Sequence, residues 1–223
     1  MNVVLGYLGS YIYLFGVILG ITFLQRLLKF STELSRKMIH ILIGATWLIL
    51  YHAFWPNKQI LIVPISFIII NALSYKFKLF SAIERDDDHD NHLGTIYFSI
   101  AITILFMMAL YWPKTIMASG IAVFCLCFGD GFAAIAGTMA SRPIRITPSK
   151  SIQGTLACML ASFFGMLLFS WIMHYPMPIF ACVILAIACG LLELVGNGLD
   201  NFSITFGIYA LASMFIYYGV FVC

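Results

Sequence analysis

Hydrophobic residues fill this chain in eight long runs, which short polar segments separate. A helix needs about 20 consecutive apolar residues to cross the hydrocarbon core of a membrane, and each run is close to that length. The pattern therefore predicts an all-α membrane protein with about eight transmembrane helices. The predicted spans are 3–24, 38–54, 59–75, 93–112, 115–140, 154–174, 177–195 and 202–222.

Charged residues fall almost entirely on one side of these spans. Ten of the twelve Lys and Arg residues and all nine Asp and Glu residues lie there, which leaves only Lys58 and Lys114 opposite. Because cytoplasmic loops carry an excess of Lys and Arg, this asymmetry predicts a cytoplasmic charged face and both termini on the extracytoplasmic side. The predicted cytoplasmic loops are 25–37, 76–92, 141–153 and 196–201.

The composition agrees with this topology. Hydrophobic residues make up 62% of the chain and charged residues 9%, against about 25% charged residues in soluble domains. Residues 1–223 are therefore predicted to form a single integral-membrane domain. The net charge of +3 is explained by the loops, and no basic and aromatic patch indicates a nucleic-acid partner.

A basic motif opens the second predicted span. Arg36, Lys37 and His40 share one helix face through their i,i+3 and i,i+4 spacings. Two cations and an imidazole at the membrane surface indicate a phosphate site. The alternative is that the cations only anchor the topology and that His40 packs in the core.

An acidic residue lies among small residues in the fifth predicted span. Asp130 stands between Gly129 and Gly131, and an ionisable group at membrane depth is a candidate functional residue. Glycine allows close backbone approach to a ligand, and a lone carboxylate favours a metal or a cation. The glycines, with Gly137, also predict a break in this helix with its backbone lining a polar cavity.

The sixth predicted span begins with hydroxyls beside a cation. Lys150, Ser151 and Thr155 surround Gly154 at this helix N-terminus, where unpaired N–H groups favour an anion. The spacing is not that of a Walker A loop. The alternative is a simple helix cap with a lysine that only sets the topology.

The turn between the last two spans offers oxygen ligands. It contains Glu193, Asn197, Asp200 and Asn201, and carboxylates and amides are ligands that Mg²⁺ accepts. A polar turn would explain Asn197 but not Glu193. Together the four motifs predict phosphoryl or nucleotidyl transfer on one membrane face.

These motifs, in this order over residues 35–206, resemble those of the polyprenol kinase family, which includes dolichol kinase and phytol kinase. The resemblance implies a multi-span enzyme that phosphorylates a lipid alcohol with CTP, or a related nucleotide, and a divalent cation such as Mg²⁺. Gln153 stands where many members have Glu. The related phosphatidate cytidylyltransferases end in an Asp-Arg-x-Asp-Ser stretch, which this chain lacks.

Site roles follow from the motifs and the resemblance together. The predicted catalytic residues are Asp130, His40, Lys150 and Asp200, and the predicted metal ligands are Asp130, Glu193, Asp200 and Asn201. The residues predicted to bind the nucleotide and its phosphates are Arg36, Lys37, Gly129, Gly131, Lys150, Ser151, Gly154 and Thr155.

The predicted acceptor is an isoprenoid alcohol from the bilayer, such as phytol, geranylgeraniol, or a polyprenol or dolichol. The predicted enzyme is a multi-pass protein of a cell inner membrane or the endoplasmic reticulum membrane, with its active site on the cytoplasmic face. The alternatives are a cytidylyltransferase acting on a lipid phosphate, a CTP-dependent diacylglycerol kinase and, in another class, a small ion-coupled transporter.

Overall fold

A computed structural model describes residues 3–77, 93–196 and 198–221 of the chain. The chain divides into two compact units, Met1–Leu110 and Tyr111–Cys223. The predicted motif region 35–206 crosses this boundary. Arg36, Lys37 and His40 lie in the first unit, and the other candidate site residues lie in the second.

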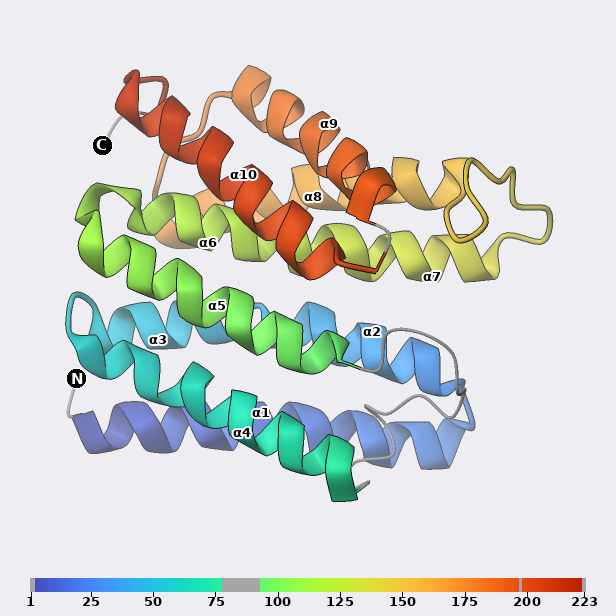
Figure 1. Cartoon of the computed structure of the whole chain (residues 1–223), viewed down its shortest axis with the longest axis horizontal. Coiled ribbons are helices and arrows are strands. Elements are labelled where there is room, and N and C mark those ends of the chain that lie inside the picture. The colour runs from blue at the N-terminus through green and yellow to red at the C-terminus, as the bar shows by residue number, and fades with distance from the viewer. Residues whose placement is uncertain (1–2, 78–92, 197, 222–223) are drawn as a thin grey trace. The chain divides into compact units, whose positions relative to one another are not determined.

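Helices joined by short turns make up the described part of the first unit. Buried aromatic rings and polar pairs hold them together, including Trp47 stacked on Phe106 with ring centroids 6.3 Å apart and Tyr11 hydrogen-bonded to Ser66 at 2.8 Å. Its elements are α1 (Val3–Leu28), α2 (Thr32–Ile43), α3 (Thr46–Phe54), the 3₁₀ helix η1 (Lys58–Leu61), α4 (Ile62–Phe77) and α5 (Gly94–Tyr111), which ends at the boundary (Figure 1).

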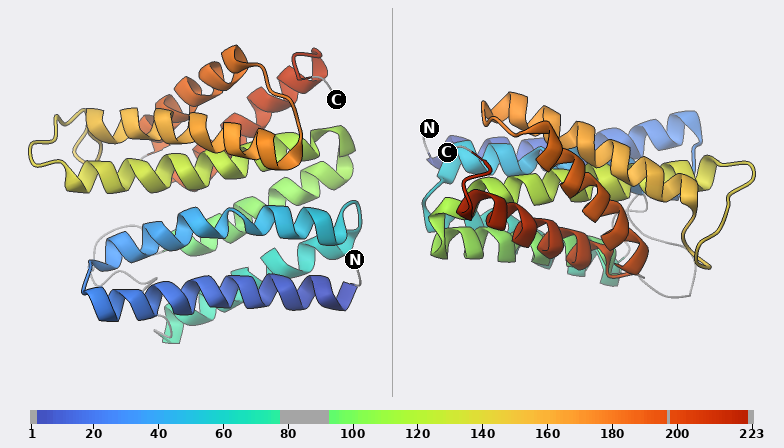
Figure 2. Two further views of the ribbon diagram at one scale, coloured as in Figure 1. Left: turned by 180° about the vertical axis from the view of Figure 1, so that it is seen from behind. Right: turned by 90° about the horizontal axis from the view of Figure 1, so that it is seen from above.

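The second unit carries most of the predicted site. In Figures 1 and 2, α6 and α7 follow one another along a single axis, with α8 beside them. The elements are the 3₁₀ helix η2 (Pro113–Thr115), α6 (Ile116–Phe124), the π-helix η3 (Cys125–Asp130), α7 (Gly131–Met139), α8 (Ile152–Met173), α9 (Ile179–Gly196) and α10 (Asp200–Tyr217).

Seven described segments are long and apolar enough to cross a membrane. They coincide with the first seven predicted spans and support a multi-pass, all-α membrane protein. Helix α10 forms in the region of the eighth predicted span but is not among the seven, and it begins with the polar pair Asp200-Asn201. The eighth crossing and the sidedness of the termini stay predictions.

The connection between the first two predicted spans is much shorter than predicted. We expected a connection over residues 25–37, but α1 continues to Leu28 and α2 begins at Thr32. The Ser31 side chain caps α2 by accepting a hydrogen bond from Leu34 N at 3.3 Å. Hydropathy marks the apolar part of a helix and misses a polar first turn, which is why the prediction was wrong here.

The predicted break in the fifth span is instead a π-helical segment. Helical structure is continuous from Ile116 to Met139, and η3 replaces α-helical geometry at the glycine motif. Single π-helical turns are rare and are often found at functional sites. The described backbone is therefore widened but not unwound at Asp130.

Glycines allow the helices of the second unit to pack closely. A Cβ atom at Gly129 would collide with Ser162 Oγ and would lie 3.0 Å from Cys189 Sγ, so η3 contacts α8 and α9 through this position. A Cβ atom at Gly154 would lie 3.0 Å from the Ala133 carbonyl oxygen. The two glycines bring α8 against the segment that carries Asp130.

Candidate functional site

Three parts of the second unit meet at the side chain of Lys150. This residue precedes α8, and its Nζ lies 2.6 Å from Glu193 Oε1 and 2.9 Å from Asp200 Oδ2. Glu193 is in the last turn of α9, and Asp200 begins α10. One ammonium group therefore holds two carboxylates from two further helices.

This ion-pair cluster, defined as Lys150, Glu193 and Asp200, is largely shielded from solvent. The side chains are 13%, 4% and 18% exposed, respectively. Thr155 Oγ1 donates a hydrogen bond to Glu193 Oε2 at 3.2 Å, so each oxygen of Glu193 has a partner. Asp200 Oδ1 is buried, and it has no hydrogen-bond partner among the described residues.

The electrostatics keep Lys150 charged. Burial lowers the pKa of its ammonium group, but the nearby carboxylates of Asp200 and Glu193 outweigh that effect, and the net pKa is raised above its usual value. A cation that stays protonated at neutral pH suits a site for carboxylates or phosphates.

Asp130 adds a third carboxylate to this region. Its side chain is buried at the junction of η3 and α7. The pKa of Asp200, which lies outside the seven apolar segments, is raised mainly by burial and also by the charges of Asp130 and Glu193, against the opposing effect of Lys150. Two carboxylates thus pair with the Lys150 ammonium, and the charge of a third, that of Asp130, acts on Asp200; this excess of negative charge suits a further cation.

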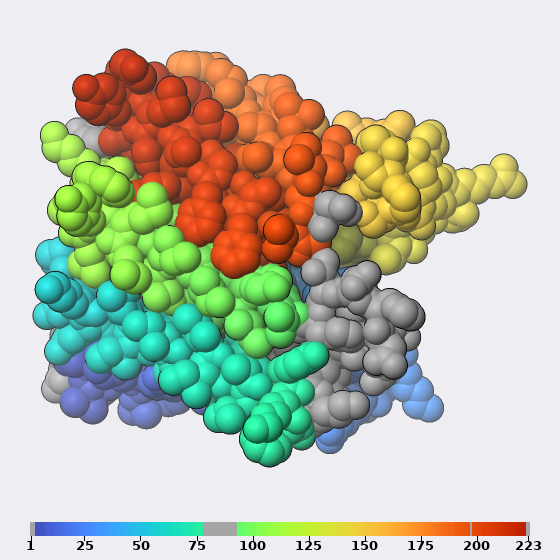
Figure 3. Space-filling view, in the orientation of Figure 1, coloured from blue at the N-terminus to red at the C-terminus, as the bar shows by residue number. Residues whose placement is uncertain are grey.

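The segment before α8 is folded so that Lys150 points at these carboxylates. Residues 145 and 151 form an isolated antiparallel bridge, and Lys150 N donates to Thr147 Oγ1 at 3.1 Å. Ser151 Oγ accepts a hydrogen bond from Gly154 N at 3.2 Å and caps α8. The segment projects from the second unit in the space-filling view (Figure 3).

Gln153 braces the same segment. Its Oε1 accepts a hydrogen bond from Ile144 N at 3.0 Å, and its Nε2 donates to the Arg142 carbonyl at 3.4 Å. A glutamate at this position could accept the first bond, but when ionised it could not donate the second. Its amide therefore has a structural function in the loop of this protein.

Several of the predicted phosphate residues of the second unit already have partners within the protein. Lys150 and Thr155 bind carboxylates, Ser151 caps a helix, and Gly129 and Gly154 serve close packing. Gly131 is buried at the start of α7. Their binding of a nucleotide stays a prediction.

The basic motif of the first unit is helical, as its spacing predicted. Arg36 forms an ion pair with Glu33 one turn earlier, with Nη2 2.7 Å from Oε1. Lys37 is buried, and the His40 ring makes an edge contact with Phe98 at 4.9 Å between centroids. Glu33 was missed in the sequence analysis, although its i,i+3 spacing to Arg36 was a usable signal.

The predicted metal ligands do not form a ready coordination sphere. Among the described residues, no group of three or more His, Cys, Asp and Glu side chains is arranged to hold a metal ion. Lys150 instead joins Glu193 and Asp200, and Asn201 follows in the first turn of α10. Asn197 lies outside the described residues. The oxygen donors and the buried Asp200 Oδ1 nevertheless suit a hard divalent cation.

The role of Gly196 becomes visible only in the structure. A Cβ atom there would overlap Asp200 Oδ1 and would lie 2.8 Å from Ser203 Oγ. The missing side chain at the end of α9 therefore makes room for the Asp200 carboxylate. The signal in the sequence is a glycine four residues before a candidate ligand, which is too common a spacing to be specific.

Two phytol kinases align with most of this chain. A rice protein (Oryza sativa subsp. japonica) described as probable phytol kinase 2, chloroplastic, is 29% identical over 188 residues, covering 75% of this chain and 58% of that protein. The phytol kinase of Synechocystis sp. is 29% identical over 193 residues, covering 86% of this chain and 79% of that protein. The chain is similar to phytol kinases.

These relatives support a phytol-kinase-like family and agree with the predicted resemblance to polyprenol kinases. The chain spans 58% of the length of the rice protein and 79% of the Synechocystis protein. No family model and no solved structure matches the chain.

Proposed function

We propose that this protein is a membrane-embedded lipid-alcohol kinase that transfers the terminal phosphate of a nucleoside triphosphate to the hydroxyl of an isoprenoid alcohol. The proposed donor is CTP, and phytol is the first acceptor to test because both relatives are described as phytol kinases or probable phytol kinases. Geranylgeraniol, polyprenols and dolichols are related acceptors.

The observation that carries this proposal is the convergence of separate motifs on Lys150. Its ammonium group contacts a carboxylate from α9 and another from α10, and Thr155 of α8 binds the same Glu193. Catalysis of phosphoryl transfer consists mostly of positioning and charge neutralisation, so it needs a cluster of this kind.

We assign the chain's residues as follows. Asp130, Asp200 and Glu193, with Asn201, would hold a divalent cation such as Mg²⁺. When bound, this cation would neutralise phosphate charge. Lys150 now supplies positive charge to Glu193 and Asp200, and sharing those carboxylates with a divalent cation would free its ammonium group for a phosphate.

The remaining predicted residues complete the assignment. Ser151 and Thr155 would donate hydrogen bonds to phosphate oxygens near the N-terminus of α8. Arg36 and Lys37 would contribute charge, and His40 would orient the acceptor hydroxyl or take its proton. The acceptor would enter from the bilayer, because seven described segments are long and apolar enough to cross a membrane.

The decisive experiment uses the purified protein in lipid nanodiscs with γ-labelled CTP and a panel of lipid alcohols. We expect label on phytol or a related alcohol and release of CDP. We also expect Asp130→Asn and Asp200→Asn to lower turnover about 10²-fold or more, because each removes a charge that stabilises the transition state. Lys58→Gln, on the opposite predicted side, should retain activity.

Other outcomes would redirect or end the proposal. Release of pyrophosphate with a cytidylylated lipid would identify the cytidylyltransferase alternative, and label on diacylglycerol alone would identify the diacylglycerol kinase. Uptake of a solute into vesicles without nucleotide consumption would favour the transporter. An Asp130→Asn enzyme with normal turnover would remove that residue from the site.

A further inference from the structure

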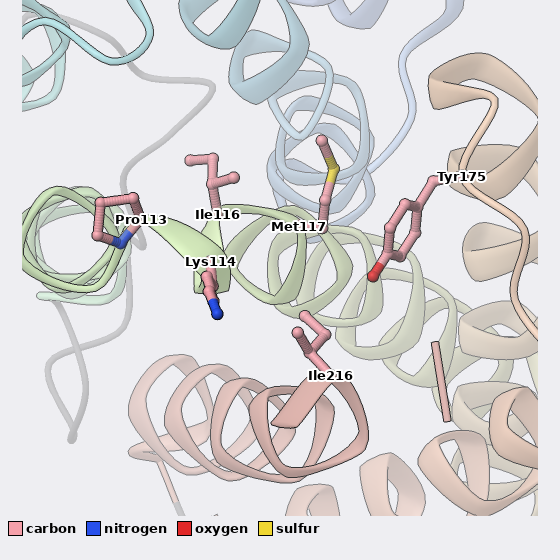
Figure 4. Close-up of a pocket in the computed structure, with 6 residues that line it drawn as sticks. All are labelled: Pro113, Lys114, Ile116, Met117, Tyr175 and Ile216. Carbon is pink, nitrogen blue, oxygen red and sulfur yellow. The ribbon is translucent and has the colours of Figure 1, made fainter. Parts of the chain in front are cut away.

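A pocket of about 460 Å³ lies in the second unit, at the N-terminal end of the helical segment Pro113–Met139. Its lining is mostly apolar and comes from the start of α6, the connection between α8 and α9, and the last turn of α10. The lining residues are Pro113, Lys114, Ile116, Met117, Tyr175 and Ile216 (Figure 4).

Two polar groups accompany this apolar lining. In Figure 4 the Lys114 ammonium and the Tyr175 hydroxyl lie on either side of Ile216. Lys114 is exposed, whereas Tyr175 is buried. The lining residues include no acidic side chain, so the charge of the pocket is positive and would be complementary to an anion.

Exposed aromatic residues next to the lining residues indicate that this pocket lies at a membrane–water interface. Trp112 precedes Pro113, and Tyr217 and Tyr218 follow Ile216; their side chains are 53%, 83% and 72% exposed. Tyrosine and tryptophan concentrate at the level of the lipid headgroups. A ligand here would therefore meet headgroup chemistry at one end and hydrocarbon at the other.

The pocket is separate from the ion-pair cluster. Asp200 of the cluster and Ile216 of the pocket are sixteen positions apart on α10, which corresponds to about 24 Å along the axis at 1.5 Å per residue. None of its lining residues belongs to the proposed catalytic machinery. The pocket therefore serves some purpose other than holding the reacting phosphate.

We propose that this pocket binds a single anionic phospholipid. The Lys114 ammonium would bind the lipid phosphate, and the Tyr175 hydroxyl would donate to an ester or phosphate oxygen. The first part of an acyl chain would pack on Met117 and Ile216. The lining has a cationic end and an apolar floor, and an anionic lipid is complementary to both.

The test measures lipid binding by native mass spectrometry on delipidated protein in detergent. The probes are phosphatidylglycerol, phosphatidylcholine and inorganic phosphate, and the variants are Lys114→Gln and Lys58→Gln. Lys58 is a matched control because it is the other basic residue on the same predicted side. We expect Lys114→Gln to weaken phosphatidylglycerol binding about tenfold, and Lys58→Gln to leave it unchanged.

A second variant tests the apolar part of the pocket. Ile216→Trp adds volume beside Met117 and should weaken binding of phosphatidylglycerol and phosphatidylcholine alike. The proposal is overturned if Lys114→Gln binds phosphatidylglycerol as wild type does, or if Lys58→Gln loses as much binding. Displacement of the lipid by equimolar inorganic phosphate would also overturn it, because the site would then recognise the phosphate alone.

Discussion

Helices α2 and α8 begin alike but use their basic residues differently. Each is capped by a serine, Ser31 or Ser151, whose oxygen accepts a backbone hydrogen bond. Arg36 pairs with Glu33 on its own helix, whereas Lys150 reaches Asp200, 50 residues away in the sequence. A local pair requires only the helix, but the Lys150 pairs require the second unit to be folded.

The two ion pairs also differ in their surroundings. The Arg36 and Glu33 side chains are 20% and 31% exposed, but Glu193 in the Lys150 cluster is only 4% exposed. Exposed pairs contribute little to stability, whereas breaking a buried pair leaves an uncompensated charge. Substitutions in the buried cluster are therefore expected to lower the free energy of unfolding the most, and substitutions at the more exposed Arg36–Glu33 pair the least.

The largest effect is expected from Lys150→Met. It leaves two shielded carboxylates without their cation, and the free energy of unfolding should fall by about 3–5 kcal/mol. Denaturant titration in detergent micelles measures this. The triple variant that adds Glu193→Gln and Asp200→Asn should recover part of the loss, since it removes all three charges. A loss below about 1 kcal/mol for Lys150→Met alone would contradict the prediction that the Lys150 ion pairs matter more for stability than the Arg36 ion pair.

Glycines extend the comparison to helix packing. Gly129→Ala should lower the free energy of unfolding by about 1–3 kcal/mol, because its Cβ would collide with Ser162 and crowd Cys189. Gly16→Ala on α1 is the control, since a Cβ there meets no described atom within 4 Å. That control should not destabilise the protein. Equal effects would mean that η3 is less tightly packed than the structure shows.

Removing the two caps separates helix capping from the buried cluster. Ser31→Ala and Ser151→Ala should each lower the free energy of unfolding by about 1 kcal/mol. Ser151 is buried and adjoins Lys150, so its variant should have the larger effect and should also reduce CTP binding. Thermal unfolding and equilibrium binding of CTP measure these two quantities. Identical results for both serines would argue against a nucleotide site at α8.

The smallest change in stability is expected from Arg36→Gln. A helical i,i+3 ion pair contributes about 0.2–0.5 kcal/mol, so unfolding should hardly change. Arg36 is also a proposed phosphate residue, and its loss should raise the KM for CTP about tenfold. Steady-state kinetics and unfolding on the same preparation separate these effects. Unchanged kinetics would leave Arg36 as a membrane-surface anchor.

The sequence was sufficient to predict most helices, because apolar runs of about 20 residues in so hydrophobic a chain are typical of membrane-spanning helices. It also identified Asp130, Lys150, Glu193 and Asp200 as candidates, since charges are conspicuous beside apolar runs. It could not predict that Lys150 pairs with Glu193 and Asp200, because those contacts depend on how α8, α9 and α10 pack.

Other features left too weak a signal in the sequence. The polar first turn of α2 and its cap Ser31 are indistinguishable from a loop by hydropathy, because neither contributes to an apolar run. The π-helix was not predictable from periodicity, since residues 116–128 are almost uniformly apolar and show no polar face whose phase could shift. Gly129 was interpreted as a position of ligand approach, and only the structure shows the side chains that pack on it.

The π-helical turn at Cys125–Asp130 also sets the rotational phase of everything that follows it in the helix. A π turn accommodates one more residue than an α turn, and each α-helical residue corresponds to about 100° of rotation. If the same residues adopted α-helical geometry instead, α7 would be rotated by about that angle about the common axis. Phe132, now exposed, would then point in the direction in which Ala133 is now buried, without any change in its own chemistry.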